Sequence, residues 1–191
     1  MHGLGFVVSC LVLLGPAPGP RTAQDPKKAH DPKTADAESA DLIAEELRQD
    51  ALQIRRGQAR KAIASLEEIL DEDAGNVRAR ILLSEALWEK GEPLRSLAAA
   101  EKASSDAAGS PEYRRPAALA LAKVLTAVGR ASDATTALEQ AGVSTPNGAG
   151  EAWILGSALW AAGRRDPAKA ALRVGAQAPD CLLYTSDAAD E

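Results

Sequence analysis

A segment that ends in glycine recurs along the chain, and it limits the folds that the chain can adopt. The segment reads VRARILLSEALWEKG at residues 77–91, and two later segments end in the same way at Gly129 and Gly163. Each segment carries two pairs of small or apolar residues. The first pair stands eight and seven positions before the glycine: Leu83-Ser84, Leu121-Ala122 and Leu155-Gly156. The second pair stands five and four positions before it: Ala86-Leu87, Val124-Leu125 and Ala158-Leu159. With Gly57, the glycines are 34, 38 and 34 residues apart. A period of this length indicates a stacked helical repeat.

The residues after each glycine also recur. A small residue follows five positions later and an apolar residue nine positions later: Ala62, Ser96, Ala134 and Ala168, then Leu66, Ala100, Leu138 and Leu172. We expect a helix before each glycine and a second helix after it, with the glycine in the left-handed conformation. The small residues Ser84, Ala122 and Gly156 should face Ser96, Ala134 and Ala168, so that the two helices approach closely.

This pattern resembles the tetratricopeptide repeat family. The resemblance implies an all-α fold, a right-handed superhelical solenoid of about four helix-turn-helix repeats over residues 39–180, with repeats at about 39–76, 77–114, 115–148 and 149–180. Asp50 stands where later repeats have a small residue, so repeat one is either divergent or an N-terminal cap. Four extra residues between repeats two and three indicate a lengthened loop or a longer helix, with a helix start at Ser110-Pro111-Glu112. A contact role for Tyr113 is the weaker reading of this stretch.

Composition excludes several kinds of function. The hydrophobic residues are mostly Ala and Leu, with only three Trp, two Tyr and one Phe, which favours closely packed helices. The net charge of −5 and the absence of a long basic run argue against nucleic-acid binding. Both histidines and both cysteines lie outside residues 41–180, so this region has no residues for a Ser-His-Asp or Cys-His site or for the usual zinc sites. We expect no catalytic residue, cofactor or metal there.

The N-terminal residues resemble a targeting segment. Residues 4–14, LGFVVSCLVLL, suit the apolar region of a secretory signal peptide and are too short for a membrane-spanning helix. We predict a signal peptide or N-terminal anchor at 1–17 and export to the periplasm or the extracellular space. Cys10 resembles the lipidated cysteine of a bacterial lipoprotein, which would tether the chain to a membrane, although an incidental cysteine is the preferred reading. Residues 18–38 lack apolar periodicity and are predicted to form a disordered linker.

Residues 181–191, CLLYTSDAADE, resemble the translation of a transposase-type sequencing adapter. We therefore exclude this tail from the fold prediction and expect it to be disordered. On this interpretation the sequence is a truncated fragment of a longer reading frame.

The resemblance also implies a function, because the first helices of such repeats line a concave groove that binds a protein or peptide. The groove residues implied here are Ile81, Glu85, Trp88, Glu89, Leu119, Lys123, Thr126, Trp153, Ser157 and Trp160. Each Trp could instead serve mainly in packing. We predict an exported scaffold for protein–protein interaction without chemistry of its own. The alternative is the N-terminal recruiting module of a larger exported enzyme, for instance a peptidase, and a third possibility is a structural spacer.

Overall fold

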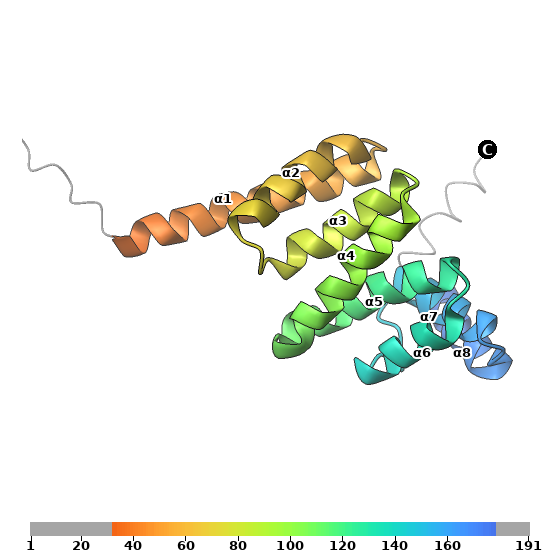
Figure 1. The fold of residues 1–191 in the computed structure, drawn as a ribbon. Helices are drawn as coiled ribbons and strands as arrows, with labels where there is room; N and C mark the ends of the chain where they lie inside the picture. The colour runs from red at the N-terminus through yellow and green to blue at the C-terminus, as the bar shows by residue number, and fades with distance from the viewer. Residues whose placement is uncertain (1–31, 179–191) are drawn as a thin grey trace, which may run out of the picture.

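The structure is a computed structural model that describes residues 32–178, with side chains from Ser39 onward. It consists of helices α1 (Pro32–Arg55), α2 (Ala59–Glu72), α3 (Val77–Glu89), α4 (Pro93–Asp106), α5 (Pro111–Ala127), α6 (Ala131–Gln140), α7 (Ala149–Ala161) and α8 (Arg165–Ala176), with a short 3-10 helix at Ala107–Gly109 (Figure 1). Residues 32–178 contain no β-strand, and the all-α prediction is confirmed. The predictions for 1–17, for 181–191 and for the linker up to residue 31 lie outside the described residues.

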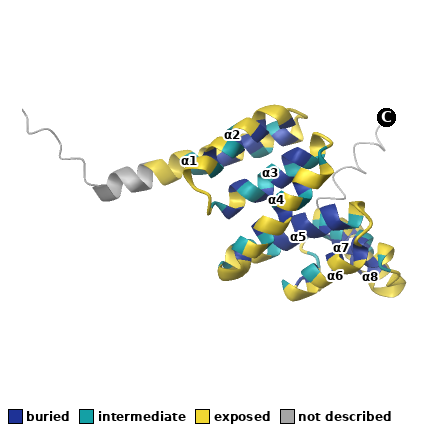
Figure 2. Cartoon of the chain, in the orientation of Figure 1, coloured by how far each residue is buried: buried dark blue, intermediate teal, exposed yellow. Residues whose placement is uncertain are grey.

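The helices form four antiparallel hairpins that stack in chain order. The hairpins are α1–α2, α3–α4, α5–α6 and α7–α8, and each first helix packs against the first helix of the next hairpin. Buried residues lie on the sides of the helices that face a neighbour, and exposed residues lie on the outer sides (Figure 2). This arrangement is the helical-repeat solenoid that the period predicts.

The repeat glycines end the first helices as expected. Gly91 has φ +84°, and the amide of Glu92 donates to the carbonyl oxygen of Leu87 at 2.9 Å, which satisfies a carbonyl at the helix end. The same bond recurs after Gly57, Gly129 and Gly163. A fifth such turn, at Gly142, ends α6 and falls outside the period.

The contact between small residues on paired helices is clearest in the second hairpin. The hydroxyl of Ser96 donates to the carbonyl oxygen of Ser84 at 2.8 Å, and the two hydroxyl oxygens are 3.3 Å apart in a buried position. In the fourth hairpin, the close neighbour of Gly156 on the second helix is Leu172. A Cβ built on Gly156 would lie 2.6 Å from Leu172, so this glycine makes room for a leucine on α8.

One helix boundary also differs from the expected one. Helix α1 begins at Pro32 and not near Ser39, so the last seven residues assigned to the linker are helical. Proline suits the first helical turn, because its missing N–H has no partner there. The four extra residues between repeats two and three lengthen a helix, which is one of the two predicted alternatives. Helix α5 starts at Pro111, where the sequence predicts a helix start, and has 17 residues, whereas α3 and α7 have 13 each. Tyr113 packs against the buried cluster that contains Val77 and Ile81.

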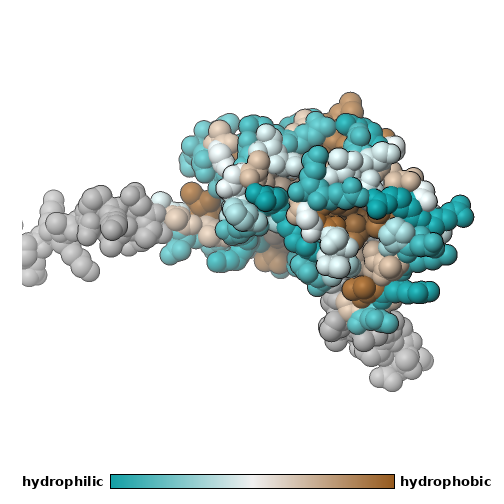
Figure 3. Space-filling view, turned by 90° about the horizontal axis from the view of Figure 1, so that it is seen from below, coloured by the Kyte–Doolittle hydropathy of each residue, from teal (hydrophilic) through white to brown (hydrophobic). Residues whose placement is uncertain are grey.

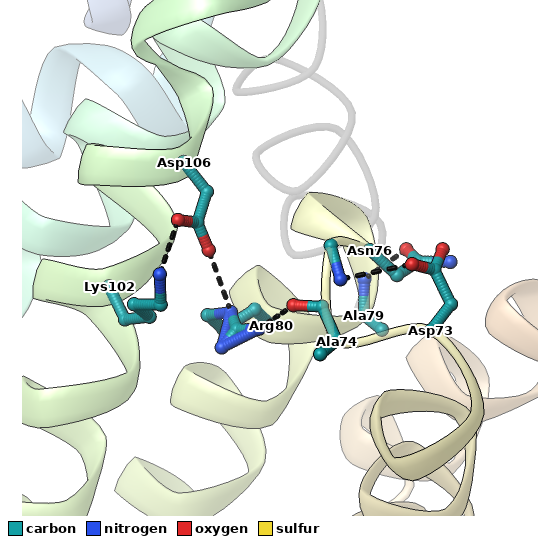
Figure 4. A network of polar contacts seen from close by, with 8 residues as sticks. Asp73, Ala74, Asn76, Ala79, Arg80, Lys102 and Asp106 are labelled. Atoms are coloured by element: carbon teal, nitrogen blue, oxygen red, sulfur yellow. Dashed lines mark hydrogen bonds and ion pairs between the residues drawn. The ribbon is translucent and has the colours of Figure 1, made fainter.

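Polar contacts fix the turn between α2 and α3. Asn76 caps α3 by accepting a hydrogen bond from the amide of Ala79 at 3.0 Å. Arg80 donates to the carbonyl oxygen of Ala74, and its Nε lies 3.3 Å from Asp106 Oδ2 on α4 (Figure 4). Lys102 donates to the other oxygen of Asp106 at 2.6 Å. The network connects the turn to the end of the following hairpin.

Ion pairs also connect consecutive hairpins through a glutamate that stands at one repeat position of the second helix. Ten residues after each of the first three repeat glycines stands a glutamate, and an arginine of the next hairpin binds it: Glu67 with Arg95, Glu101 with Arg130, and Glu139 with Arg164. These side chains are about half exposed, so each pair adds little stability. The three ion pairs nonetheless recur between each hairpin and the next one along the chain.

Candidate functional site

The first helices of the second, third and fourth hairpins together form a surface hollow of about 450 Å³. Five of the residues predicted to face the groove line it: Trp88, Lys123, Thr126, Trp153 and Ser157. Trp88 and Thr126 stand three residues before their repeat glycines, and Lys123 and Ser157 stand six before theirs. The repeat period therefore places side chains of three helices around one hollow.

The lining combines aromatic surface with few polar groups. Trp153 is 69% exposed, whereas Trp88 is partly buried. The hydroxyl of Ser157 donates to the carbonyl oxygen of Ile154 at 3.0 Å, and the hydroxyl oxygen of Thr126 is buried without a hydrogen-bond partner in the structure. Three further lining residues, which sequence reasoning missed, are Ala127, Gly150 and Ile154. Gly150 and Ile154 lie on the α7 face that carries Trp153, so the helical period could have identified them.

Charged groups lie beside the hollow on α3 and α5. Lys123 Nζ lies 3.9 Å from Glu89 Oε1, and both side chains are at least 40% exposed. Burial raises the pKa of Glu85, while the charges of Lys123 and Arg55 oppose the rise. The predicted residues Glu85, Glu89 and Lys123 therefore form one mixed-charge group next to the aromatic hollow.

Two of the predicted groove residues are not on the surface. Ile81 packs with Ala117 and Ala120 of α5, and Leu119 packs with Leu155 of α7. Each is covered by the first helix of the following hairpin, so both belong to the core and the groove assignment for them is corrected. The sequence offsets alone do not show which first-helix positions the next hairpin covers.

Trp160 is not among the residues that line the hollow. Its side chain is 51% exposed, and the guanidinium carbon of Arg165 lies 5.6 Å from the centre of its ring. That distance permits a cation–π interaction. Trp160 is thus at the surface, on the α7 face that also carries Trp153.

The other surface hollows of the described residues have a less apolar lining than this one. Seen from below, apolar patches are separated by hydrophilic residues (Figure 3). A second hollow of about 380 Å³ lies at the turn after α1, where Arg60, Lys61, Glu89 and Lys90 contribute charged side chains. Within residues 32–178, no helix is long and apolar enough to cross a membrane. The same residues hold no group of three His, Cys, Asp or Glu side chains that could bind a metal ion.

Comparison with known protein families gives a match over part of the chain. Residues 53–115 match the family model described as tetratricopeptide repeat. The matched segment runs from the end of α1 through α2, α3 and α4 into the start of α5. No curated protein matches the chain.

Proposed function

Since residues 53–115 match the tetratricopeptide repeat model, we propose that the chain is an exported scaffold that binds a partner protein through the hollow between α3, α5 and α7. Such repeats generally mediate protein–protein interactions. The observation that carries the proposal is the joint lining of one hollow by Trp88 and Trp153, which come from hairpins two and four. Tryptophans in a concave site are frequent anchors of protein binding.

The chemistry of the hollow suggests what the partner presents. Its aromatic walls favour an apolar or aromatic side chain, because most of the binding energy would come from removing apolar surface from water. The carboxylates of Glu85 and Glu89 and the ammonium group of Lys123 would then contact polar groups on either side of that side chain. We infer a peptide segment with one apolar anchor between polar residues.

The binding proposal is tested with peptides selected from a random display library on the full chain. Trp88→Ala and Lys123→Ala should each weaken the selected peptides at least roughly tenfold, as expected for an anchor and its polar neighbour. Leu94→Ala is the matched control, because Leu94 is 80% exposed on α4 and does not line the hollow. Peptides that bind the Trp88→Ala variant as tightly as the unchanged chain would refute the site.

Export is tested separately from binding. Residues 1–40 are fused to a reporter enzyme that is active only outside the bacterial cytoplasm, and activity is expected with the native leader. Replacing Val7 and Val8 by Asp should abolish it, because charges interrupt the apolar segment. Equal activity with both leaders, or none with either, would remove export from the proposal. Loss of membrane association with Cys10→Ser would indicate a lipid anchor.

A further inference from the structure

A second hollow adjoins the aromatic one at the end of α3. Trp88 lines the hollow between α3, α5 and α7, and the next residue, Glu89, lines the hollow at the turn between α1 and α2. Lys123 Nζ, from the lining of the first hollow, lies 3.9 Å from Glu89 Oε1. Both of these side chains are at least 40% exposed, so their ion pair lies at the surface where the two hollows meet. A peptide that extends from the first hollow past this ion pair therefore reaches the second.

The second hollow is lined mainly by charged side chains. Its volume is about 380 Å³, and its lining carries three cations, Arg60, Lys61 and Lys90, and one carboxylate, Glu89. Lys90 pairs with Glu92 at 2.7 Å. Arg60 and Lys61 are exposed, and neither forms an ion pair with another described residue. These two cations are available to an acidic partner.

Two further arginines extend the cations of the second hollow along the end of α1. Arg55 is the last residue of α1 and Arg56 follows it, directly before Gly57, which lines the hollow. Both arginines are exposed, and neither forms an ion pair within the described part of the chain. The charge of Arg55 also acts on the carboxylate of Glu85, which belongs to the mixed-charge group beside the aromatic hollow. We define the cationic surface as Arg55, Arg56, Arg60 and Lys61.

The charge of the cationic surface selects the kind of partner. A single exposed cation is ordinary protein surface, but here four cations lie within seven residues and beside a proposed binding site. The chain as a whole has a net charge of −5, so its overall field attracts basic molecules. The cationic surface instead requires carboxylates, and they must lie close to it because salt screens exposed charges over about 10 Å. Charge complementarity therefore favours acidic residues attached to the apolar anchor.

We propose that the partner peptide continues from its apolar anchor in the aromatic hollow into an acidic segment, whose side-chain carboxylates pair with the cationic surface. The acidic segment presupposes the proposed function, because it is attached to the anchor that the aromatic hollow binds. Glu89 lies between the two hollows and repels carboxylates, so the acidic residues begin beyond it and not directly beside the anchor. The pairing takes place at an exposed surface, so it contributes mainly to specificity and to the rate of association.

The test uses the tightest peptide that the display library yields on the full chain. This peptide is extended at either end, after a short Gly-Ser spacer, by a run of glutamates, serines or lysines, and both termini are blocked so that only side-chain charges differ. Calorimetric titration should show that the glutamate extension at one end binds roughly tenfold tighter than the serine extension, and that the lysine extension binds more weakly than either. The difference should shrink in high salt, because salt screens exposed ion pairs.

Two double variants locate the effect on the chain. Arg60→Glu/Lys61→Glu should reverse the preference, and glutamates suit the first turn of α2, so the fold should be retained, which circular dichroism checks. Arg78→Glu/Lys169→Glu is the matched control, because it makes the same change of charge at exposed residues that line neither hollow. The control variant should keep the preference for glutamates.

The outcomes distinguish the acidic segment from the aromatic hollow. A peptide whose affinity Trp88→Ala leaves unchanged refutes the hollow and, with it, the acidic segment, as does a library without any binder. Equal affinity of the three extensions, or a preference that the control variant changes as much as Arg60→Glu/Lys61→Glu does, would overturn the acidic segment alone. Concentration-dependent self-association in sedimentation velocity that Arg60→Glu/Lys61→Glu abolishes would also overturn it, since a second copy would then supply the carboxylates.

Discussion

Arg115 on α5 and Glu151 on α7 form a two-pronged ion pair across 36 residues of sequence. The Arg115 Nε donates to Glu151 Oε1 at 3.2 Å and its Nη2 donates to Oε2 at 2.5 Å, while Nη2 also donates to the carbonyl oxygen of Thr145. Glu151 further accepts the amide of Asn147 at 2.8 Å. One carboxylate thus joins the third hairpin to the fourth and holds the loop between them.

We expect Glu151→Gln to destabilise the chain by roughly 2 kcal/mol near neutral pH, because it breaks charged hydrogen bonds in a mostly buried position. The hydrogen bond from Arg115 holds the pKa of Glu151 below its ordinary value. An acid with a lowered folded pKa stabilises the fold above its unfolded pKa and loses this effect as the pH falls through the folded value. The difference between variant and unchanged chain, measured by urea unfolding, should therefore shrink on acidification.

Glu139→Gln is the control for this pair. Glu139 binds Arg164 in an exposed ion pair, so its replacement should leave the urea midpoint unchanged. A difference for Glu151→Gln that stayed constant down to the lowest pH would show that charge does not cause its effect.

The closing glycines provide a second prediction. Gly129 has φ +84°, and a Cβ there would meet no atom within 4 Å, so Gly129→Ala costs backbone strain alone, about 1 kcal/mol. Gly150 lies in helix α7 without a positive φ and also has open space, so Gly150→Ala should stabilise the fold by up to about 1 kcal/mol. Thermal unfolding of both variants measures the contrast. Equal effects of the two substitutions would contradict a conformational origin.

The sequence predicted the stacked hairpins because their determinants are local. A glycine in the left-handed conformation and small residues at fixed offsets from it act within one hairpin, so Gly91, Ser84 and Ser96 could be assigned from the period alone. Contacts between hairpins leave a weaker signal. The pair of Arg115 and Glu151 has no counterpart at the same positions of the other repeats, and no period reveals it.

Burial of the groove positions likewise depends on neighbouring hairpins. Leu119 and Trp153 stand at the same repeat position and were both assigned to the groove. The structure buries Leu119 in a cluster that includes Leu155 of α7 and leaves Trp153 exposed, because within residues 32–178 a later first helix packs against α5 and none packs against α7. The start of α1 escapes prediction for another reason, since residues 32–38 carry no apolar period in the sequence.

The buried serines of the second hairpin provide a third prediction. Ser96→Ala removes the hydrogen bond to the Ser84 carbonyl oxygen and should cost about 1 kcal/mol. The double variant Ser84→Ala/Ser96→Ala should lose less stability than the sum of the losses of the two single variants, because it removes both hydroxyls from the same buried contact. Alanines already occupy this contact in hairpin three, as Ala122 and Ala134. Urea unfolding of the three variants measures the coupling. Strict additivity would show that the two hydroxyls act independently.

Asp50, in the first hairpin, provides the last prediction. It is almost fully buried between α1 and α2, and the Ser65 hydroxyl oxygen lies 2.9 Å from Asp50 Oδ2 and 3.0 Å from Glu46 Oε1. That hydroxyl has one proton and can donate to only one of the two carboxylates at a time. Burial raises the pKa of Asp50 above its ordinary value of 3.8, the hydrogen bond from Ser65 opposes the rise, and the charge of Glu46 adds to it.

An acid with a raised folded pKa favours the fold at low pH, and this contribution is lost as the pH rises through the folded value. Asp50→Asn removes the buried charge and should stabilise the chain at neutral pH by about 1 kcal/mol, the usual scale of a single substitution. The gain should vanish below pH 3.8, the ordinary pKa at which the unfolded side chain also takes up its proton. Urea unfolding of the variant and the unchanged chain, from neutral pH to below pH 3.8, measures this gain in stability. A gain that does not change with pH, or a loss of stability at neutral pH, would mean that Asp50 contributes through its shape and hydrogen bond and that its charge carries no penalty.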